Sequence, residues 1–222
     1  MKLHVERARS SDGPWAVLFH GFARSGAHLQ GLADALTLRG VATVRPDLGA
    51  LNWFRSPNNA RYLDHLVARL APIVGSGAVL VGHSAGAAVA AYCAPRLDAC
   101  AGIVMVDGVE NQTHHIERNW AALTRIPIIA IGAPPSPCNR RGLLDRQLTA
   151  WGFSGLHGVV TGAGHGDIQD GNPWITRAVC GSRSSAETKE FVRSCAVWST
   201  CTLLGVQPDV ADPWQDPRLV RM

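Results

Sequence analysis

Short, largely apolar runs alternate with segments of helical spacing along the 222-residue chain. Because such runs do not alternate polar and apolar positions, they are typical of strands buried on both faces. Strands buried in this way and separated by helices predict an α/β fold: a mostly parallel central sheet with helices on both faces. We expect strands over residues 16–19, 41–44, 78–81, 103–106, 128–131 and 157–160, and helices over 28–38, 61–73 and 87–93.

The two ends of the chain carry weaker patterns. About one strand is expected before residue 16, and the tail after Gly205, with Pro208, Pro213 and Pro217, is expected to be irregular and packed on the surface. There is no internal repeat and no low-complexity linker, and the length suits one domain over residues 1–222.

Composition excludes several classes of protein. The chain is 46% hydrophobic and 17% charged, which is typical of a globular protein, and its formal net charge is only +4. It has no dense Lys/Arg run, so we expect no nucleic-acid partner. No apolar run approaches the roughly 18 residues of a membrane span. The first residues lack the apolar stretch of a signal peptide, which leaves the cytoplasm or a secreted mature form as the expected locations.

The six cysteines leave two interpretations open. None forms a CxxC pair, so a zinc site is not indicated. Cys93 falls in a predicted helix and is expected in the core. A disulfide among Cys180, Cys195 and Cys201, or from one of them to Cys138, competes with buried free thiols. Two aspartates in residues 166–170 are too few for a calcium site, so neither a metal nor a cofactor is expected.

The strongest chemical signal is Ser84 in the pentapeptide Gly82-His83-Ser84-Ala85-Gly86. This Gly-x-Ser-x-Gly pattern follows an apolar strand and opens an Ala-rich helix, which is the setting of a nucleophile elbow. The turn is tight, and the two glycines give it room. The alternative is that the serine only caps the helix.

A second segment supplies the expected oxyanion hole. His20-Gly21-Phe22 follows the strand over 16–19, and acyl transfer needs two backbone N–H donors aimed at the developing oxyanion. We assign these donors to Phe22 and Ala85. His20 is interpreted as a structural histidine that orients the loop.

The base and the acid are expected after later strands. His165 lies on a glycine-rich loop behind the last predicted strand and is the candidate base, ahead of His83, His114 and His115. Asp107 ends the strand over 103–106 and is the candidate acid. The alternatives are Asp145, inside a predicted helix, and Asp167 or Asp170.

These motifs resemble the chlorophyllase and cutinase-like (polyester-hydrolase) branch of the α/β-hydrolases. The resemblance covers residues 16–173 and rests on the segments 19–22, 82–86, 106–108 and 164–167. It implies an α/β-hydrolase fold and places the acid at Asp107, as in chlorophyllases, whereas polyester hydrolases usually carry it one strand later. Chlorophyll is not carried over as the substrate.

Ser84, His165 and Asp107 predict a serine esterase that acts through an acyl-enzyme. Residues 108–127 are too few for a cap domain, so an uncovered nucleophile that accepts small or polymeric, bulky esters is expected, and Trp53, Trp120 and Trp174 are candidates to line the cleft. A thioesterase or acyltransferase of the same fold, and a non-catalytic binding protein, remain as alternatives. A monomer is the default expectation.

Overall fold

A computed structural model describes the chain apart from residues 9–12, 50–55, 76, 111–113, 172–179 and 181–183. The described part contains a sheet of eight strands in the order β1-β3-β2-β4-β5-β6-β7-β8. Strands β2 to β7 run parallel, and β1 and β8 pair antiparallel at the two edges. The strands are β1 Leu3–Glu6, β2 Trp15–Phe19, β3 Ala42–Pro46, β4 Ala78–His83, β5 Cys100–Val106, β6 Ile128–Gly132, β7 Leu156–Val160 and β8 Leu219–Arg221.

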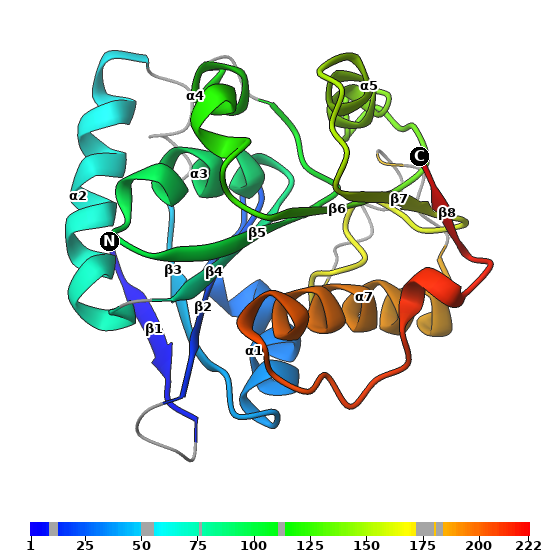
Figure 1. Ribbon diagram of the computed structural model, residues 1–222, viewed down its shortest axis with the longest axis horizontal. Coiled ribbons are helices and arrows are strands. Elements are labelled where there is room, and N and C mark those ends of the chain that lie inside the picture. Colours follow the sequence, from blue (N-terminus) through cyan, green and yellow to red (C-terminus); the bar gives the residue numbers. More distant parts are fainter. Residues whose placement is uncertain (9–12, 50–55, 76, 111–113, 172–179, 181–183) are drawn as a thin grey trace.

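Helices cover both faces of the sheet (Figure 1). One apolar core joins the sheet to α2, α3, α4 and α5, and a second core joins the other face to α1 and α7. Both faces of the central strands are therefore buried, which explains why their sequences are continuously apolar. The helices are α1 Gln30–Thr37, α2 Ser56–Val74, α3 Ala85–Cys93, α4 His115–Leu123, α5 Leu143–Ala150 and α7 Ala186–Leu204, with short 3-10 turns at Gly26–Leu29, Ala94–Arg96 and Pro213–Gln215.

The predicted strands and helices are all present, but three further regions differ from expectation. Helix α4, His115–Leu123, was not predicted. The 19-residue helix α7 was not predicted, and it buries Phe191, Cys195 and Cys201 against the sheet. The tail after Gly205 was expected to be irregular, yet it ends in β8, which pairs with β7. These last two signals are weak in the sequence because polar Thr and Ser interrupt the apolar face of α7 and β8 has only three residues.

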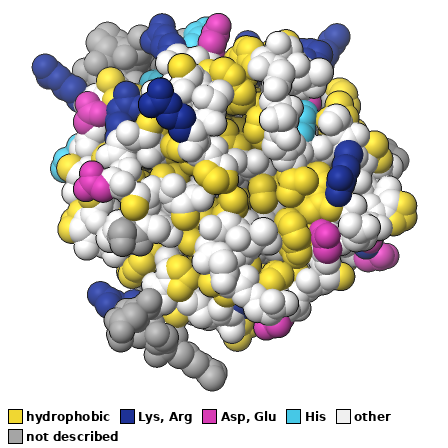
Figure 2. Space-filling model, viewed as in Figure 1, with side chains coloured by type: hydrophobic (Ala, Val, Ile, Leu, Met, Phe, Trp, Pro, Cys, Tyr) yellow, Lys and Arg dark blue, Asp and Glu magenta, His cyan; other side chains and the backbone are white. Residues whose placement is uncertain are grey.

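The outer surface carries no concentrated charge on the face shown in Figure 2. Lys and Arg side chains are dispersed there among acidic and apolar ones, so this face offers no basic stripe for a nucleic acid. Among the described residues, no helix combines the length and the apolar character that a membrane span requires.

Two glycines allow helix α3 to start directly against the sheet. A Cβ atom on Gly82 would lie 2.5 Å from the carbonyl oxygen of Gly86, and one on Gly86 would overlap the carbonyl oxygen of Phe19. The crowding atoms are backbone atoms, which cannot move aside as a flexible side chain can. Small residues are therefore required on both sides of residue 84.

We expect Gly86→Ala to lower the free energy of unfolding by about 3 kcal/mol or more, because the new methyl group overlaps β2 backbone. Gly205→Ala is the control: Gly205 has φ +67° but open space around it, so its cost is limited to backbone strain of about 1–2 kcal/mol. Urea denaturation measures both. Equal losses in the two variants would contradict the steric explanation.

Candidate active site

Ser84 occupies a sharp turn between β4 and α3. Its φ is 53°, in the left-handed region that a non-glycine residue enters at a cost of about 1–2 kcal/mol. Backbone hydrogen bonds hold it there: Ser84 N–H donates to Val106 O at 3.1 Å, and Val109 N–H donates to Ser84 O at 3.0 Å. The Ser84 side chain makes no capping bond to α3, so the helix-cap interpretation of this serine is wrong.

His165 and Asp107 lie beside Ser84 in a continuous line of hydrogen bonds. His165 Nε2 is 2.9 Å from Ser84 Oγ, and His165 Nδ1 is 2.6 Å from Asp107 Oδ2. All three residues follow the carboxyl ends of parallel strands, β4, β5 and β7, which is where open α/β sheets place their ligand sites. The three residues are buried, at 6–9% exposure, so little water competes for these bonds.

The alternative acids are engaged elsewhere. Asp145 Oδ1 is 2.9 Å from His157 Nε2. Asp167 accepts the N–H of Gly164 within its own loop at 2.7 Å, and Asp170 accepts the N–H of Gly31 at 2.6 Å and pairs with an arginine of α7. Among the described residues, neither Asp145 nor Asp170 forms a hydrogen bond with His165.

The alternative histidines fall into separate environments. His114 is exposed and bonds Glu117, whereas His115 is buried against the Tyr92 ring. His20 receives the Leu48 N–H at Nε2, 2.9 Å away, so its proton sits on Nδ1 and is donated to Gly21 O at 2.7 Å. This pair of bonds agrees with the structural role expected for His20, because it ties the loop after β2 to the chain after β3.

The loop expected to form the oxyanion hole lies directly against the serine. A Cβ atom on Gly21 would lie 3.1 Å from Ser84 Cβ, which is closer than most Cβ atoms approach a neighbour. Phe22 follows at the mouth of the cleft with 49% of its surface exposed. Ala85 is the first residue of α3. Both candidate donors therefore border the serine, and their role in binding an oxyanion stays a prediction.

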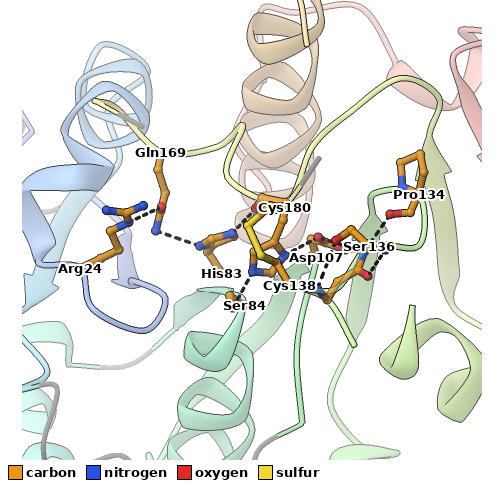
Figure 3. Close-up of a disulfide and its surroundings, with 11 residues drawn as sticks. Arg24, His83, Ser84, Asp107, Pro134, Ser136, Cys138, Gln169 and Cys180 are labelled. Carbon is orange, nitrogen blue, oxygen red and sulfur yellow. Dashed lines mark hydrogen bonds and ion pairs between the residues drawn. A yellow bond between two sulfur atoms is a disulfide. The ribbon is translucent and has the colours of Figure 1, made fainter. Parts of the chain in front are cut away.

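His83 is part of a directional chain of hydrogen bonds that sequence reasoning did not find. Arg24 is a pure donor, so Gln169 Oε1 accepts its Nε–H at 3.1 Å and Gln169 Nε2 must donate to His83 Nδ1 at 3.0 Å (Figure 3). His83 Nε2–H then donates to the carbonyl oxygen of His165 at 2.6 Å. The chain thus anchors the backbone of the candidate base.

Burial sets the charge of His83. Loss of hydration and the nearby His165 lower the pKa of His83 to about 3, so its ring is neutral at pH 7. Its ring centroid is 5.0 Å from that of His165. A neutral neighbour allows His165 to take up a proton without repulsion from a second cation.

Asn139, like Gln169, was not singled out from the sequence. Its buried side-chain amide donates from Nδ2 to Asp107 Oδ1 and Oδ2, at 3.1 and 3.3 Å. The Ala133 N–H also donates to Asp107 Oδ1, at 3.0 Å. A local sequence pattern carries no signal for Asn139, because it reaches Asp107 across the sheet edge from 32 residues away.

A cavity of about 400 Å³ opens beside Ser84. One disulfide, Cys138–Cys180, borders it, so both cysteine interpretations hold in part: a bridge to Cys138 is present, and buried free thiols occur beside it. The other four cysteines are free, and three of them are buried. The cavity is lined by Gly21, Phe22, Ala23, Arg24, His83, Ser84, Cys138, His165, Gly166, Gln169 and Cys180.

Trp120 was expected to line the cleft beside Ser84, but it does not. Trp120 lies on α4 and not on a loop; it packs against Trp151 and Phe153 away from this cavity, because these apolar rings cover the opposite end of β6. Trp53 and Trp174 lie outside the described residues. Within the described residues, no cluster of three or more His, Cys, Asp or Glu side chains could hold a metal ion.

A serine, a histidine and a carboxylate in hydrogen-bonded order at the carboxyl edge of a doubly wound sheet define the α/β-hydrolase class of protein. The chain belongs to the alpha/beta hydrolase family, whose profile matches residues 16–219. The family part of the sequence resemblance is thereby confirmed. The chlorophyllase and cutinase-like branch stays a prediction.

Solved structures support the fold. The esterase domain of a Rhodothermus marinus protein matches with a TM-score of 0.57 at 15% identity, over 90% of this chain and 97% of that one. A ferulic acid esterase from Streptomyces cinnamoneus gives 0.61 at 17%, over 95% and 74%. Acyl-protein thioesterase 2 from Zea mays gives 0.54 at 17%, over 91% and 99%. No curated protein matches the chain.

The pKa of His83 makes the folded state sensitive to acid. A histidine in the unfolded chain takes up a proton near pH 6.5, whereas the folded His83 does so only near pH 3, so stability is lost as the pH falls between these values. We expect His83→Gln, which does not titrate, to flatten the fall in unfolding free energy between pH 6 and 4 by about 1.4 kcal/mol per pH unit.

The control is His114→Gln, because His114 is exposed. Urea denaturation at several pH values gives both slopes. If the two variants depend on pH to the same extent, the buried neutral state of His83 is wrong.

Proposed function

We propose that the protein is a serine carboxylic ester hydrolase in which Ser84, His165 and Asp107 form the catalytic triad. One observation carries the proposal: the unbroken line from Ser84 Oγ through both nitrogens of His165 to Asp107. Membership of the alpha/beta hydrolase family supports it. A carboxylate that holds a histidine against a serine is the arrangement that activates a weak hydroxyl nucleophile.

In the proposed reaction, Ser84 Oγ attacks the ester carbonyl carbon while its proton passes to His165 Nε2. The carbonyl oxygen becomes an oxyanion, bound by the N–H groups of Phe22 and Ala85. The tetrahedral intermediate collapses, the bond to the alkoxy group breaks, and His165 returns the proton to the leaving alcohol. Asp107 stabilises the transient imidazolium. Water, deprotonated by His165, then releases the acid and restores Ser84. No cofactor takes part in this scheme.

The cleft suits a small ester, or a bulky ester whose larger part remains outside the cavity. Its volume of about 400 Å³ holds the acyl part of a small ester. The half-exposed Phe22 at its mouth offers an apolar surface to a larger molecule that remains outside. These features agree with the cutinase-like or chlorophyllase-like preference for bulky or polymeric esters.

Replacement of the nucleophile is the first test. We expect Ser84→Ala to reduce the hydrolysis of p-nitrophenyl esters by a factor of about 10⁴ or more, because the acyl-enzyme can no longer form. Circular dichroism should show an unchanged fold. Activity near that of the wild type in Ser84→Ala would overturn the proposal.

The identity of the acid is tested by a matched pair of aspartates. We expect Asp107→Asn to lower kcat by about 10⁴-fold, since the amide cannot hold His165 in the required tautomer. Asp145→Asn leaves kcat near the wild-type value, because Asp145 contacts His157 and not His165. The reverse result would move the acid to Asp145.

The alternatives predict different substrates. Three rates, measured side by side, separate these activities. Hydrolysis of an ester reports the ester hydrolase, hydrolysis of a thioester reports the thioesterase, and transfer from an ester to an added alcohol reports the acyltransferase. Failure of a fluorophosphonate probe to label Ser84 would favour a non-catalytic binding protein.

A further inference from the structure

The loop over residues 133–142, between β6 and α5, is unusually constrained. Arg140 and Arg141 both have left-handed backbones, with φ of 52° and 58°, and Gly142 continues the turn at 67°. Left-handed backbone at two successive non-glycine residues costs free energy, and such strain persists only where surrounding contacts hold it. The Cys138–Cys180 disulfide fixes the loop to the segment before α7.

The strained turn converges on one buried side chain, Asn139, which is 1% exposed. The backbone N–H groups of Ser136 and Gly142 donate to Asn139 Oδ1 at 2.8 and 2.9 Å. Two donors on the oxygen fix the orientation of the amide, so the NH₂ group has to face the other way. The NH₂ group faces Asp107.

The Asp107 carboxylate needs this support because rotation about its last side-chain bond is intrinsically loose. Oδ1 accepts from Asn139 Nδ2 and Ala133 N, which leaves Oδ2 turned toward His165 Nδ1 at 2.6 Å. The second hydrogen of the Asn139 amide points to the carbonyl oxygens of Ala133 and Pro134, at 3.2 and 3.0 Å. The amide thus joins the carboxylate to a rigid loop.

We propose that Asn139 is a positioning residue that holds the Asp107 carboxylate in the orientation in which it supports His165. The proposal rests on the proposed function of the triad. Asn139 acts through Asp107, and it lies outside the residues that line the cavity beside Ser84. Its loop, closed by the disulfide and by the left-handed turn, supplies the rigidity that a single hydrogen bond lacks.

Asn139→Asp is the sharpest test, because it keeps the shape and the oxygen that accepts from Ser136 and Gly142. A protonated carboxyl at position 139 donates to Asp107 as the amide does, whereas an ionised one repels it. The ratio of kcat/KM for Asn139→Asp to that of the wild type should therefore be near one at acidic pH and fall by about 10- to 100-fold as the pH rises.

Charged side chains near Asp107 and Asn139 have partners of their own. His165 faces Asp107 directly, Asp145 is paired with His157, and the Arg140 guanidinium donates to Glu110 O. The control is Asn119→Asp, which makes the same change of charge on α4 beside Arg96. Its ratio to wild type should not depend on pH.

A second readout does not depend on catalysis. The Nδ1–H proton of His165 gives a far-downfield proton resonance when it is held by Asp107, and we expect this resonance to shift or vanish in Asn139→Ala, with kcat reduced about tenfold and KM unchanged. If Asn139→Ala does not fold, Asn139→Asp decides alone.

The outcomes separate the two proposals. A kcat/KM ratio for Asn139→Asp that does not change with pH, together with an unaltered resonance, overturns the role of Asn139 even when Ser84→Ala abolishes hydrolysis. If Ser84→Ala retains activity, the proposed function fails, and the resonance still tests whether Asn139 orients Asp107.

Discussion

The arrangement of the site depends on one steric constraint, the contact of helix α3 with the backbone of β2. Only a residue without a Cβ atom fits at Gly86, because a Cβ atom there would overlap the carbonyl oxygen of Phe19. A Cβ atom on Gly82 would likewise overlap the backbone of α3. This contact forces the chain to reverse within one residue, and it gives Ser84 its left-handed backbone. The side chain of Ser84 is thereby left free of the helix and directed to the histidine behind β7.

An amide side chain supports each of the two candidate residues, the base and the acid. Gln169 orients the neutral ring of His83, which in turn binds the carbonyl of His165, and Asn139 binds the carboxylate of Asp107. Both amides have their orientation fixed by donors on their oxygen atoms. The candidate triad is therefore embedded in polar contacts that leave few of its rotations open, which is the preorganisation that electrostatic catalysis requires.

The sequence predicts the central strands and the positions of Ser84, His165 and Asp107, because each of these residues follows an apolar strand. Those signals are local. Helix α7 escapes prediction since polar residues interrupt its buried face, and β8 is too short to stand out from the tail. Asn139, Gln169 and the partner of Cys138 could not be found in this way, because their roles arise only when the edge of the sheet brings distant loops together.

The left-handed backbone of Ser84 has a consequence for the directed evolution of this protein. Glycine adopts such a conformation without penalty, so a screen for heat resistance alone favours glycine at position 84, and that gain removes the proposed nucleophile. The exposed Asp209, with φ of 49°, offers the same relief far along the tail. Thermal selection on this scaffold therefore has to be coupled to a measurement of turnover.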